Sequence, residues 1–406
     1  MTSGFSDNTG LSTIRALATG SVKRRSDQSA VEASTNLTRL DLKRFCYVLP
    51  SVRVTALTAL TIAVLAACGG GSSDSNSTSK PAGAGSTNAG NEAGSVAASQ
   101  KVTFLPPASN LQQVTPTGDA TVDGIAFTNA VRHNVGYPTA IAVDNGLTTS
   151  SQNHAAYLVA NSTMGHYETA GLPGYTGASP FGRIAAVGFP NAATEVTISG
   201  DVRAFSSSLT AVQLIFDAPY HRMAMLADYA RMGVGSVNSA TWGAFNIDFG
   251  DQTTDLSSSQ VVAYPYAGQT GVPTSWYAYE DPDPFASAPQ YRQTNTGYPV
   301  TIQGKLFSKL SSVHISIGDS GGNTVLCQLQ TPENDSHLTS GAMCIPFAPL
   351  TASSTYTVHA VGVLTDSFAT GAPAHPMDLT WSFTTASPSD AKAKAASHAG
   401  RPPIVQ

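Results

Sequence analysis

Helical and extended segments after residue 115 can be distinguished by the spacing of their apolar residues. Apolar residues three or four positions apart line one face of a helix, and runs rich in β-branched residues indicate strands. The predicted helices span residues 122–133, 147–161, 183–189 and 207–216. The predicted strands span residues 193–199, 233–237 and 242–249. This mixture of helices and short strands predicts a layered α+β domain over residues 115–250.

The pattern changes at about residue 297. From there to residue 386, short β-branched and aromatic runs alternate with Gly, Pro, Asn and Asp, which is typical of a β-sandwich. The runs cover residues 300–302, 313–317, 325–329, 356–363 and 379–384. A proline-rich connector over residues 251–296 joins the two predicted domains, and residues 387–406 are predicted to be a disordered tail.

The first 67 residues contain a candidate export signal. Basic residues precede an apolar run over residues 54–64, which has the length of a secretory signal and is shorter than the ~20 residues that span a bilayer. The run leads into Leu-Ala-Ala-Cys, ending at Cys68, and resembles the bacterial lipobox. Because a polar stretch over residues 1–42 precedes the signal, either translation starts further along the chain or the leader is unusually long.

The lipobox resemblance implies that Cys68 is acylated and becomes the N-terminus of the mature protein. Several acyl chains on one residue anchor a protein firmly in a membrane, and Gly69 after the cysteine is compatible with sorting to the outer membrane. The alternative is a buried apolar helix that ends at Cys68 by chance. Residues 68–114 begin with a stretch of small and polar residues and are predicted to form a flexible linker. Together these features predict a lipid-anchored protein of the bacterial cell envelope.

Charge and cysteine content narrow the choice of partners. Charged residues make up 12% of the chain, with 21 basic and 26 acidic residues and a net charge of −5. Since no basic field is available to hold phosphates, nucleic acid is excluded as a partner. Cys327 and Cys344 lie 17 residues apart in the exported region, where an oxidising environment favours a disulfide between them.

Several short motifs follow one another in the predicted α+β domain. They are Phe127-Thr128-Asn129-Ala130-Val131-Arg132, Gln152-Asn153-His154-Ala155-Ala156-Tyr157-Leu158, Gly165-His166, Pro180-Phe181-Gly182-Arg183-Ile184, Glu195, Ala218-Pro219-Tyr220-His221-Arg222 and Met232-Gly233-Val234-Gly235. In order and spacing they resemble the bacterial branch of the CAP superfamily, named after cysteine-rich secretory proteins, antigen 5 and pathogenesis-related proteins. The resemblance implies an α-β-α sandwich whose cleft is lined by two histidines and acidic residues.

The resemblance also implies which residues line that cleft. His166 and His221 match the family's two histidines, and Glu195 matches one of its glutamates. Asp217 is the nearest match to the second acidic residue. The residues on either side of Glu195 differ from the Gly and Asn of the family.

The chemistry of these side chains is compatible with a metal. Two neutral imidazoles and a carboxylate suit a zinc ion with open coordination positions, which would activate water or polarise a carbonyl. Alternatively, His166 caps a helix end and His221 pairs with a carboxylate. His154 and Glu168 are secondary candidates for the cleft. Because His154 precedes Tyr157 on the same helical face, a structural hydrogen bond is favoured for it.

The predicted β-sandwich also resembles a known module. It contains a Thr-Tyr-Thr-Val strand over residues 355–358 and ends in a Trp-Ser-Phe-Thr-Thr strand over residues 381–385. These two strands resemble those of bacterial Ig-like domains. The resemblance implies a spacer or a binding platform.

Three functions are compatible with these observations. The first is an envelope lipoprotein whose CAP domain binds a lipid, a metal or a partner protein in a His/Glu-lined cleft. The second is a metal-dependent hydrolase that uses His166, Glu195 and His221, with Glu195 as ligand or general base. The third is a structural surface module with a vestigial cleft, which the altered neighbours of Glu195 favour. No complete catalytic constellation is visible, so we place binding first.

Overall fold

The computed structural model describes residues 100–189, 191 and 193–390. These residues all belong to one compact unit of the chain, Ala89–Gln406. The predicted signal peptide, Cys68 and the predicted linker up to residue 99 lie outside the described residues, as does the predicted tail after residue 390. None of the described helices is long and apolar enough to cross a membrane.

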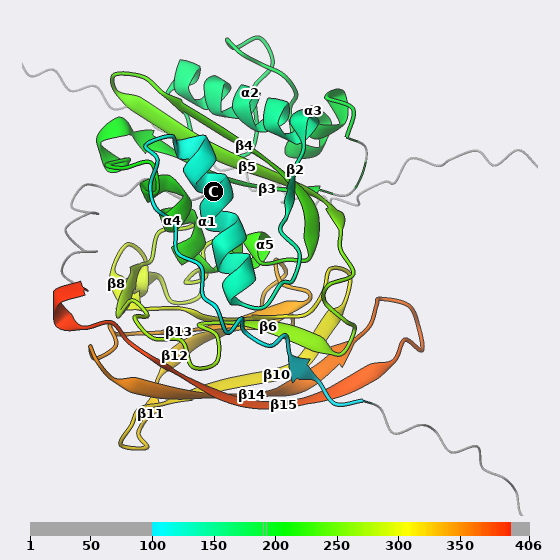
Figure 1. Cartoon of the computed structure of the whole chain (residues 1–406), viewed down its shortest axis with the longest axis vertical. Coiled ribbons are helices and arrows are strands. Elements are labelled where there is room, and N and C mark those ends of the chain that lie inside the picture. The colour runs from blue at the N-terminus through cyan, green and yellow to red at the C-terminus, as the bar shows by residue number, and fades with distance from the viewer. Residues whose placement is uncertain (1–99, 190, 192, 391–406) are drawn as a thin grey trace, which may run out of the picture. The chain divides into compact units, whose positions relative to one another are not determined.

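The first part of the described chain is a four-stranded sheet, ordered β2-β4-β5-β3, between two layers of helices (Figure 1). Helices α2 and α3 lie over one face of the sheet, and α1, α4 and α5 lie over the other. The strands are β2 (Ala142–Val143), β3 (Ala193–Asp201), β4 (Tyr229–Asn238) and β5 (Trp242–Gln252). The helices are α1 (Ala120–Asn134), α2 (Asn145–Asn161), α3 (Pro180–Ala186), η1 (Val202–Ala204), α4 (Thr210–Asp217) and α5 (Pro219–Met225). The predicted mixed α+β domain is therefore confirmed.

The helices begin where side chains satisfy their first backbone N–H groups. Asp119 accepts from the N–H groups at the start of α1, and Asp144 does the same for α2. Ser179 caps α3, which has a proline in its first turn. Such caps satisfy donors that have no partner inside the helix. Helix α5 was not predicted, although α3 has the same length of seven residues and lies where a helix was expected.

Two glycines allow α2 to pack closely on the sheet. A Cβ atom on Gly233 would lie 2.0 Å from the backbone carbon of Leu147, and one on Gly235 would lie 2.4 Å from the backbone of Ser151. The intervening Val234 belongs to the apolar core that includes α4. Because successive residues of a strand face opposite sides of the sheet, this alternation of Gly and Val serves both helical layers.

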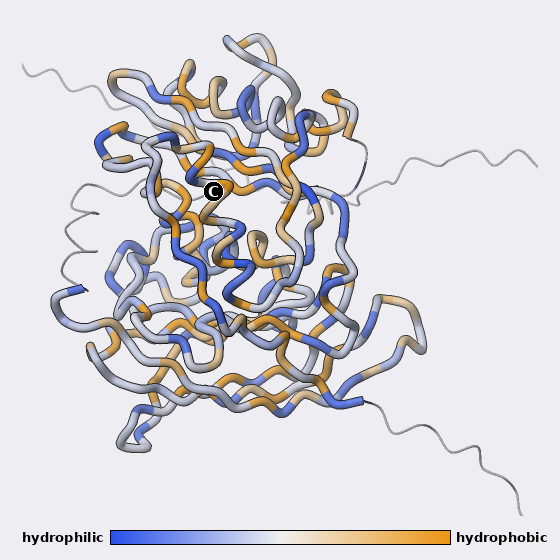
Figure 2. The backbone as a smooth tube through the Cα atoms, viewed as in Figure 1, coloured by the Kyte–Doolittle hydropathy of each residue, from blue (hydrophilic) through white to orange (hydrophobic). Residues whose placement is uncertain are grey.

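The second part of the described chain consists of two larger sheets. Their strand orders are β1-β6-β9-β13-β12 and β11-β10-β14-β15. The strands are β1 (Thr103–Phe104), β6 (Gln260–Tyr264), β9 (Val300–Gln303), β10 (Lys309–Gly318), β11 (Thr324–Val325), β12 (Cys327–Gln330), β13 (Gly341–Pro346), β14 (Thr355–Thr365) and β15 (Ala374–Thr384). A two-stranded pair, β7 (Ser275–Tyr277) and β8 (Asn295–Gly297), and η2 (Pro289–Tyr291) complete this part. Exposed and buried residues alternate along most of β14 and β15, and Figure 2 shows hydrophobic and hydrophilic segments alternating along the chain in this region. The region is thus mostly strands, as predicted, and its Ig-like type stays a prediction.

Strands β1, β6 and β7, and most of β8, lie in segments for which no regular structure was predicted. Strand β1 lies within residues 68–114, and β6 lies within the proline-rich stretch. They pair in parallel, with Thr103 opposite Gln260. Val102 and Leu105, on either side of β1, are buried. Their burial offsets the entropy of ordering the segment. The part of the predicted linker from residue 100 onward is therefore ordered, and the linker prediction is left for the residues before 100.

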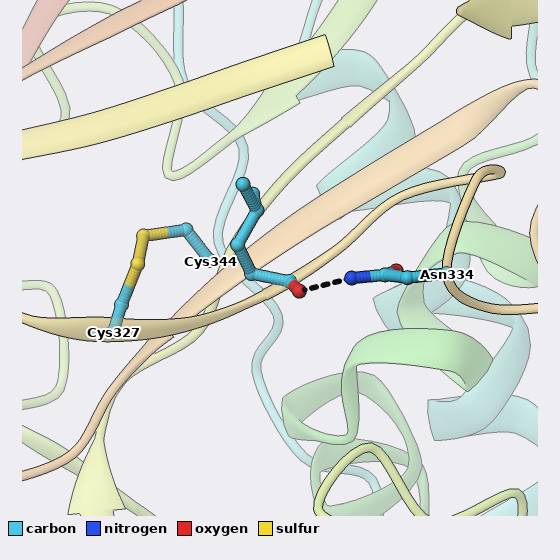
Figure 3. The surroundings of a disulfide bond; sticks show 4 residues. Cys327, Asn334 and Cys344 are labelled. Atoms are coloured by element: carbon cyan, nitrogen blue, oxygen red, sulfur yellow. Dashed lines mark hydrogen bonds between the residues drawn. A yellow bond between two sulfur atoms is a disulfide. The ribbon is translucent and has the colours of Figure 1, made fainter. Parts of the chain in front are cut away.

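The predicted disulfide is confirmed: Cys327 and Cys344 are bonded to each other (Figure 3). The bond joins the neighbouring strands β12 and β13. Close by, Asn334 Nδ2 donates to the carbonyl of Leu329 at 3.0 Å. The turn that follows β12 is therefore tied back to the strand.

The helical layer and the β region share one apolar core. Arg222 of α5 is fully buried and donates from Nη1 to the carbonyl of Pro299 at 2.7 Å. Its guanidinium lies 4.9 Å from the ring centre of Tyr264 and 4.6 Å from that of Tyr298. Cation–π contacts of this kind are strong when desolvated. They fix α5, which carries His221, against the β region.

Candidate functional site

Glu195 lies at the centre of a buried polar cluster on β3. Its Oε1 atom lies 2.8 Å from His166 Nδ1. Its Oε2 atom accepts from Arg183 Nη2 at 2.6 Å and from Asn246 Nδ2 at 3.3 Å. The side chains of Glu195 and Arg183 are inaccessible to solvent, whereas that of His166 is 28% exposed. Glu195 therefore fixes the position of His166, and both of its carboxylate oxygens face neighbouring side chains instead of solvent.

The partners of Glu195 decide its charge. Burial alone would raise its pKa, but the hydrogen bond with His166 and the attraction of His154 and Arg183 lower that pKa to about 2. Asp248 lies directly opposite Glu195 in the β3–β5 ladder. Burial and the neighbouring charge of Glu195 raise the pKa of Asp248 well above its usual range. Since two like charges repel each other there, the negative charge is favoured on Glu195 and the proton on Asp248.

His154 and Glu168 form a second buried pair behind this cluster. His154 Nδ1 lies 3.0 Å from Glu168 Oε1, and Nε2 lies 3.0 Å from the carbonyl oxygen of Gly165. Glu168 Oε2 also accepts from the N–H of Thr176 at 2.6 Å. Burial raises the pKa of Glu168, but the hydrogen bonds from His154 and Thr176 outweigh it and lower the pKa. Because each nitrogen of His154 faces an oxygen, this ring holds the loop before α3 in place and offers no atom to a ligand.

His221 on α5 has its own carboxylate, Glu280. His221 Nδ1 lies 2.7 Å from Glu280 Oε1, which also accepts from the backbone N–H of His221 at 3.1 Å. Burial raises the pKa of Glu280, and the hydrogen bond with His221 opposes that rise only in part. Glu280 Oε2 is buried and has no hydrogen-bond partner among the described residues.

Sequence analysis missed Glu280. The residue stands in the proline-rich segment, 59 positions after His221, and the acidic residues around it resemble a solvated turn. Asp217, the nearest match from the resemblance, lies elsewhere: its Oδ1 accepts from the hydroxyl of Tyr298 at 2.6 Å. The only signal in the sequence was an acidic residue in a proline-rich segment. Whether such a residue is buried cannot be read from the local sequence.

The two histidine–carboxylate pairs bring the rings of His166 and His221 together. Their ring centres lie 6.4 Å apart and their planes differ by 6°. Each ring uses Nδ1 for its carboxylate, and neither Nε2 makes a hydrogen bond to a described residue. When Nδ1–H is donated to a carboxylate, Nε2 carries a lone pair and acts as acceptor or metal ligand. The arrangement therefore presents two imidazole acceptors side by side.

A three-residue metal site is not assembled. Among residues 100–189, 191 and 193–390, no group of three or more His, Cys, Asp or Glu side chains is placed to hold an ion. Glu195 was predicted as the third ligand beside His166 and His221. In the structure its Oε1 faces His166 and its Oε2 faces Arg183. Glu195 therefore orients His166 and does not complete a shared ligand set with His166 and His221.

A comparison with protein-family models agrees with the layered fold of this part of the chain. Residues 125–249 match the family model described as CAP, the cysteine-rich secretory protein family. Comparison with curated proteins found no match. The match and the layered fold together support a CAP domain over residues 125–249, and Glu280 lies outside the matched range. A CAP domain indicates an extracellular module for ligand binding or protein interaction.

Proposed function

We propose that the protein is a lipid-anchored binding protein of the bacterial cell envelope, whose CAP domain binds its ligand through His166 and His221. The observation that carries this proposal is the pair of parallel imidazoles, each held at Nδ1 by its own carboxylate. The exposed part of the His166 side chain gives access to the pair. The lipobox-like segment at Cys68, which lies outside the described residues, supports the anchoring and the outer-membrane location.

A zinc ion is the ligand probe that the donor set fits best. Neutral imidazole nitrogen is a common zinc ligand, and a carboxylate on the other ring nitrogen raises its basicity. The Nε2 atoms of His166 and His221 would hold the ion, and a bound zinc would offer a coordination point to an oxygen or nitrogen of a further ligand. Two protein ligands are fewer than the three of catalytic zinc sites. This favours exchangeable binding over a resident catalytic metal.

The geometry gives less support to the hydrolase hypothesis. A general base works best with a pKa near the working pH, and the pKa of Glu195 is about 2. Its oxygens face His166 and Arg183, so it has no acceptor free for a water proton. Hydrolysis of an activated ester that disappears in both His166→Ala and His221→Ala would nevertheless restore that hypothesis.

The proposal is tested by zinc titration of the full chain carrying Cys68→Ser, which removes the acylated residue. We expect one zinc ion per chain by calorimetry, and at least about tenfold weaker binding in the His166→Ala/His221→Ala variant. The matched control is His314→Ala/His359→Ala, which removes two exposed histidines of the β region. Zinc binding that is absent, or equal in the two variants, would contradict the metal part of the proposal. A protein that binds neither zinc nor lipid nor a partner would support the structural-module hypothesis instead.

A further inference from the structure

A cavity whose lining does not include the histidine pair lies elsewhere in the described structure. Its volume is about 930 Å³, within the range of pockets that enclose small molecules. The CAP domain contributes residues of α5 and the start of α3, and the β region contributes residues around β9 and β13. None of His166, Glu195, His221 and Glu280 lines it.

The opening of this cavity is aromatic. Phe181, Phe307 and Phe368 line it and are 65%, 55% and 62% exposed. They are the exposed phenylalanines of the described residues, and they come from three distant segments. Single exposed apolar residues are normal on a protein surface, but a group around one concavity indicates a binding site.

Phe307 is also held in an unfavourable backbone conformation. Its φ angle is +65°, in the left-handed region that bulky residues rarely adopt. Glycine or asparagine would occupy this position with less strain. Strain of this kind is concentrated at functional sites, including ligand clamps. The strained backbone of Phe307 therefore supports a functional role for the cavity opening that the three phenylalanines line.

The charges around the cavity restrict what can bind. Among the described residues, no lysine or arginine lines it, and Asp251 is the one carboxylate. Asp251 accepts from Arg231 Nε at 3.0 Å and from Asn191. His337 lies at 3.1 Å from Asp335 through Nδ1. A ligand with a carboxylate or phosphate would therefore lose its hydration without meeting a cation.

Three further polar side chains that line the cavity already make hydrogen bonds. Gln303 donates to the carbonyl of Met223 at 2.9 Å, and Gln252 donates to Asp228 at 2.7 Å. The hydroxyl of Tyr220 donates to Asp335. The surface that remains for a ligand is mostly apolar, and Leu306 and Leu338 contribute to it.

We propose that this cavity binds an uncharged, apolar small molecule between the CAP domain and the β region. The proposal does not depend on the histidine pair. Apolar burial supplies the affinity, and the three phenylalanines cover the part of the ligand that would otherwise face water.

The test uses Nile red, an uncharged fluorescent probe, with the full chain carrying Cys68→Ser. We expect saturable binding that weakens at least about tenfold in Phe181→Ala/Phe307→Ala/Phe368→Ala. The matched control is Leu111→Ala/Leu172→Ala/Leu326→Ala, three exposed leucines that do not line the cavity, in which binding should stay within about twofold.

A second variant tests the interior. Ala224 lies on α5 and lines the cavity, so Ala224→Trp should fill it and abolish Nile red binding, whereas Ala224→Ser should not. Dodecanol should displace the probe and dodecanoate should not, because the two differ mainly in charge. Displacement by dodecanoate as effective as that by dodecanol would overturn the uncharged class of ligand.

Other outcomes would overturn the site itself. Equal Nile red binding in the phenylalanine and leucine variants would do so. So would a dimeric mass by light scattering that becomes monomeric only in the phenylalanine variant, since the opening would then be an interface between copies. Zinc titration of the phenylalanine variant should match wild type, and Nile red binding should survive His166→Ala/His221→Ala. The two proposals can therefore fail separately.

Discussion

The two histidine–carboxylate pairs share the same chemistry but differ in charge. Glu195 contacts Arg183 as well as His166, and its pKa falls to about 2. Glu280 contacts His221, no arginine or lysine of the described residues forms an ion pair with it, and burial raises its pKa. The lowered pKa of Glu195 thus favours its charged form, whereas the raised pKa of Glu280 shifts that residue toward its neutral form. The difference teaches that a histidine partner alone does not fix the charge of a buried carboxylate, because Glu195 is also stabilised by His154 and Arg183.

The largest effect should come from removing the arginine that distinguishes the pairs. Arg183→Met leaves the Glu195 charge buried without its cation, and breaking such a pair costs about 3–5 kcal/mol in the free energy of unfolding. Urea unfolding at pH 7 measures the loss. The control is Arg203→Met, which removes the exposed partner of Asp201 and should leave the unfolding midpoint unchanged. Equal midpoints for the two variants would show that Arg183 does not set the charge of Glu195.

An intermediate effect should appear when each carboxylate is neutralised. Because the folded pKa of Glu195 is lowered, its stabilisation is present above its unfolded value near 4.5 and is lost as the pH falls toward 2. The stability difference between wild type and Glu195→Gln should therefore shrink over that window. Glu280 has the opposite sign: its contribution is present below about 4.5 and is lost as the pH rises through its raised pKa.

Glu280→Gln should therefore gain stability relative to wild type as the pH rises above about 4.5. Unfolding free energies of the three proteins between pH 2 and pH 8 give both trends. Parallel curves for the two glutamine variants would contradict the assigned difference between the pairs.

At pH 4, the smallest effect should come from Asp248→Asn, which replaces a carboxyl group whose raised pKa favours the neutral form. Below pH 4 the variant should match wild type within about 1 kcal/mol. Because the pKa of Asp248 is raised in the folded state, wild type loses the corresponding stability as the pH rises, and the variant does not. Thermal melts at pH 4 and pH 7 measure this. A variant less stable at pH 7 than at pH 4, relative to wild type, would indicate an ionised Asp248.

Much of the CAP domain could be predicted along the chain. Helices α1, α2 and α4 and strands β3, β4 and β5 lie where the spacing of apolar residues placed them, because each buries one face against the same layer. The same reasoning missed α5, and it missed β13, whose residues are all buried and do not alternate. The motifs also pointed to His166, Glu195 and His221, although not to how they meet.

What the chain itself specifies is local: helix starts set by Asp119 and Asp144, strands set by their residue types, and the two cysteines of one disulfide. What only the tertiary structure decides depends on residues distant in sequence. Glu280 reaches His221 across 59 positions, the proton on Asp248 depends on a charge on the opposite strand, and three phenylalanines surround a cavity to which two regions contribute. The physical reason is that local propensities act over a few residues, whereas burial and electrostatics depend on every group that the folded chain brings near.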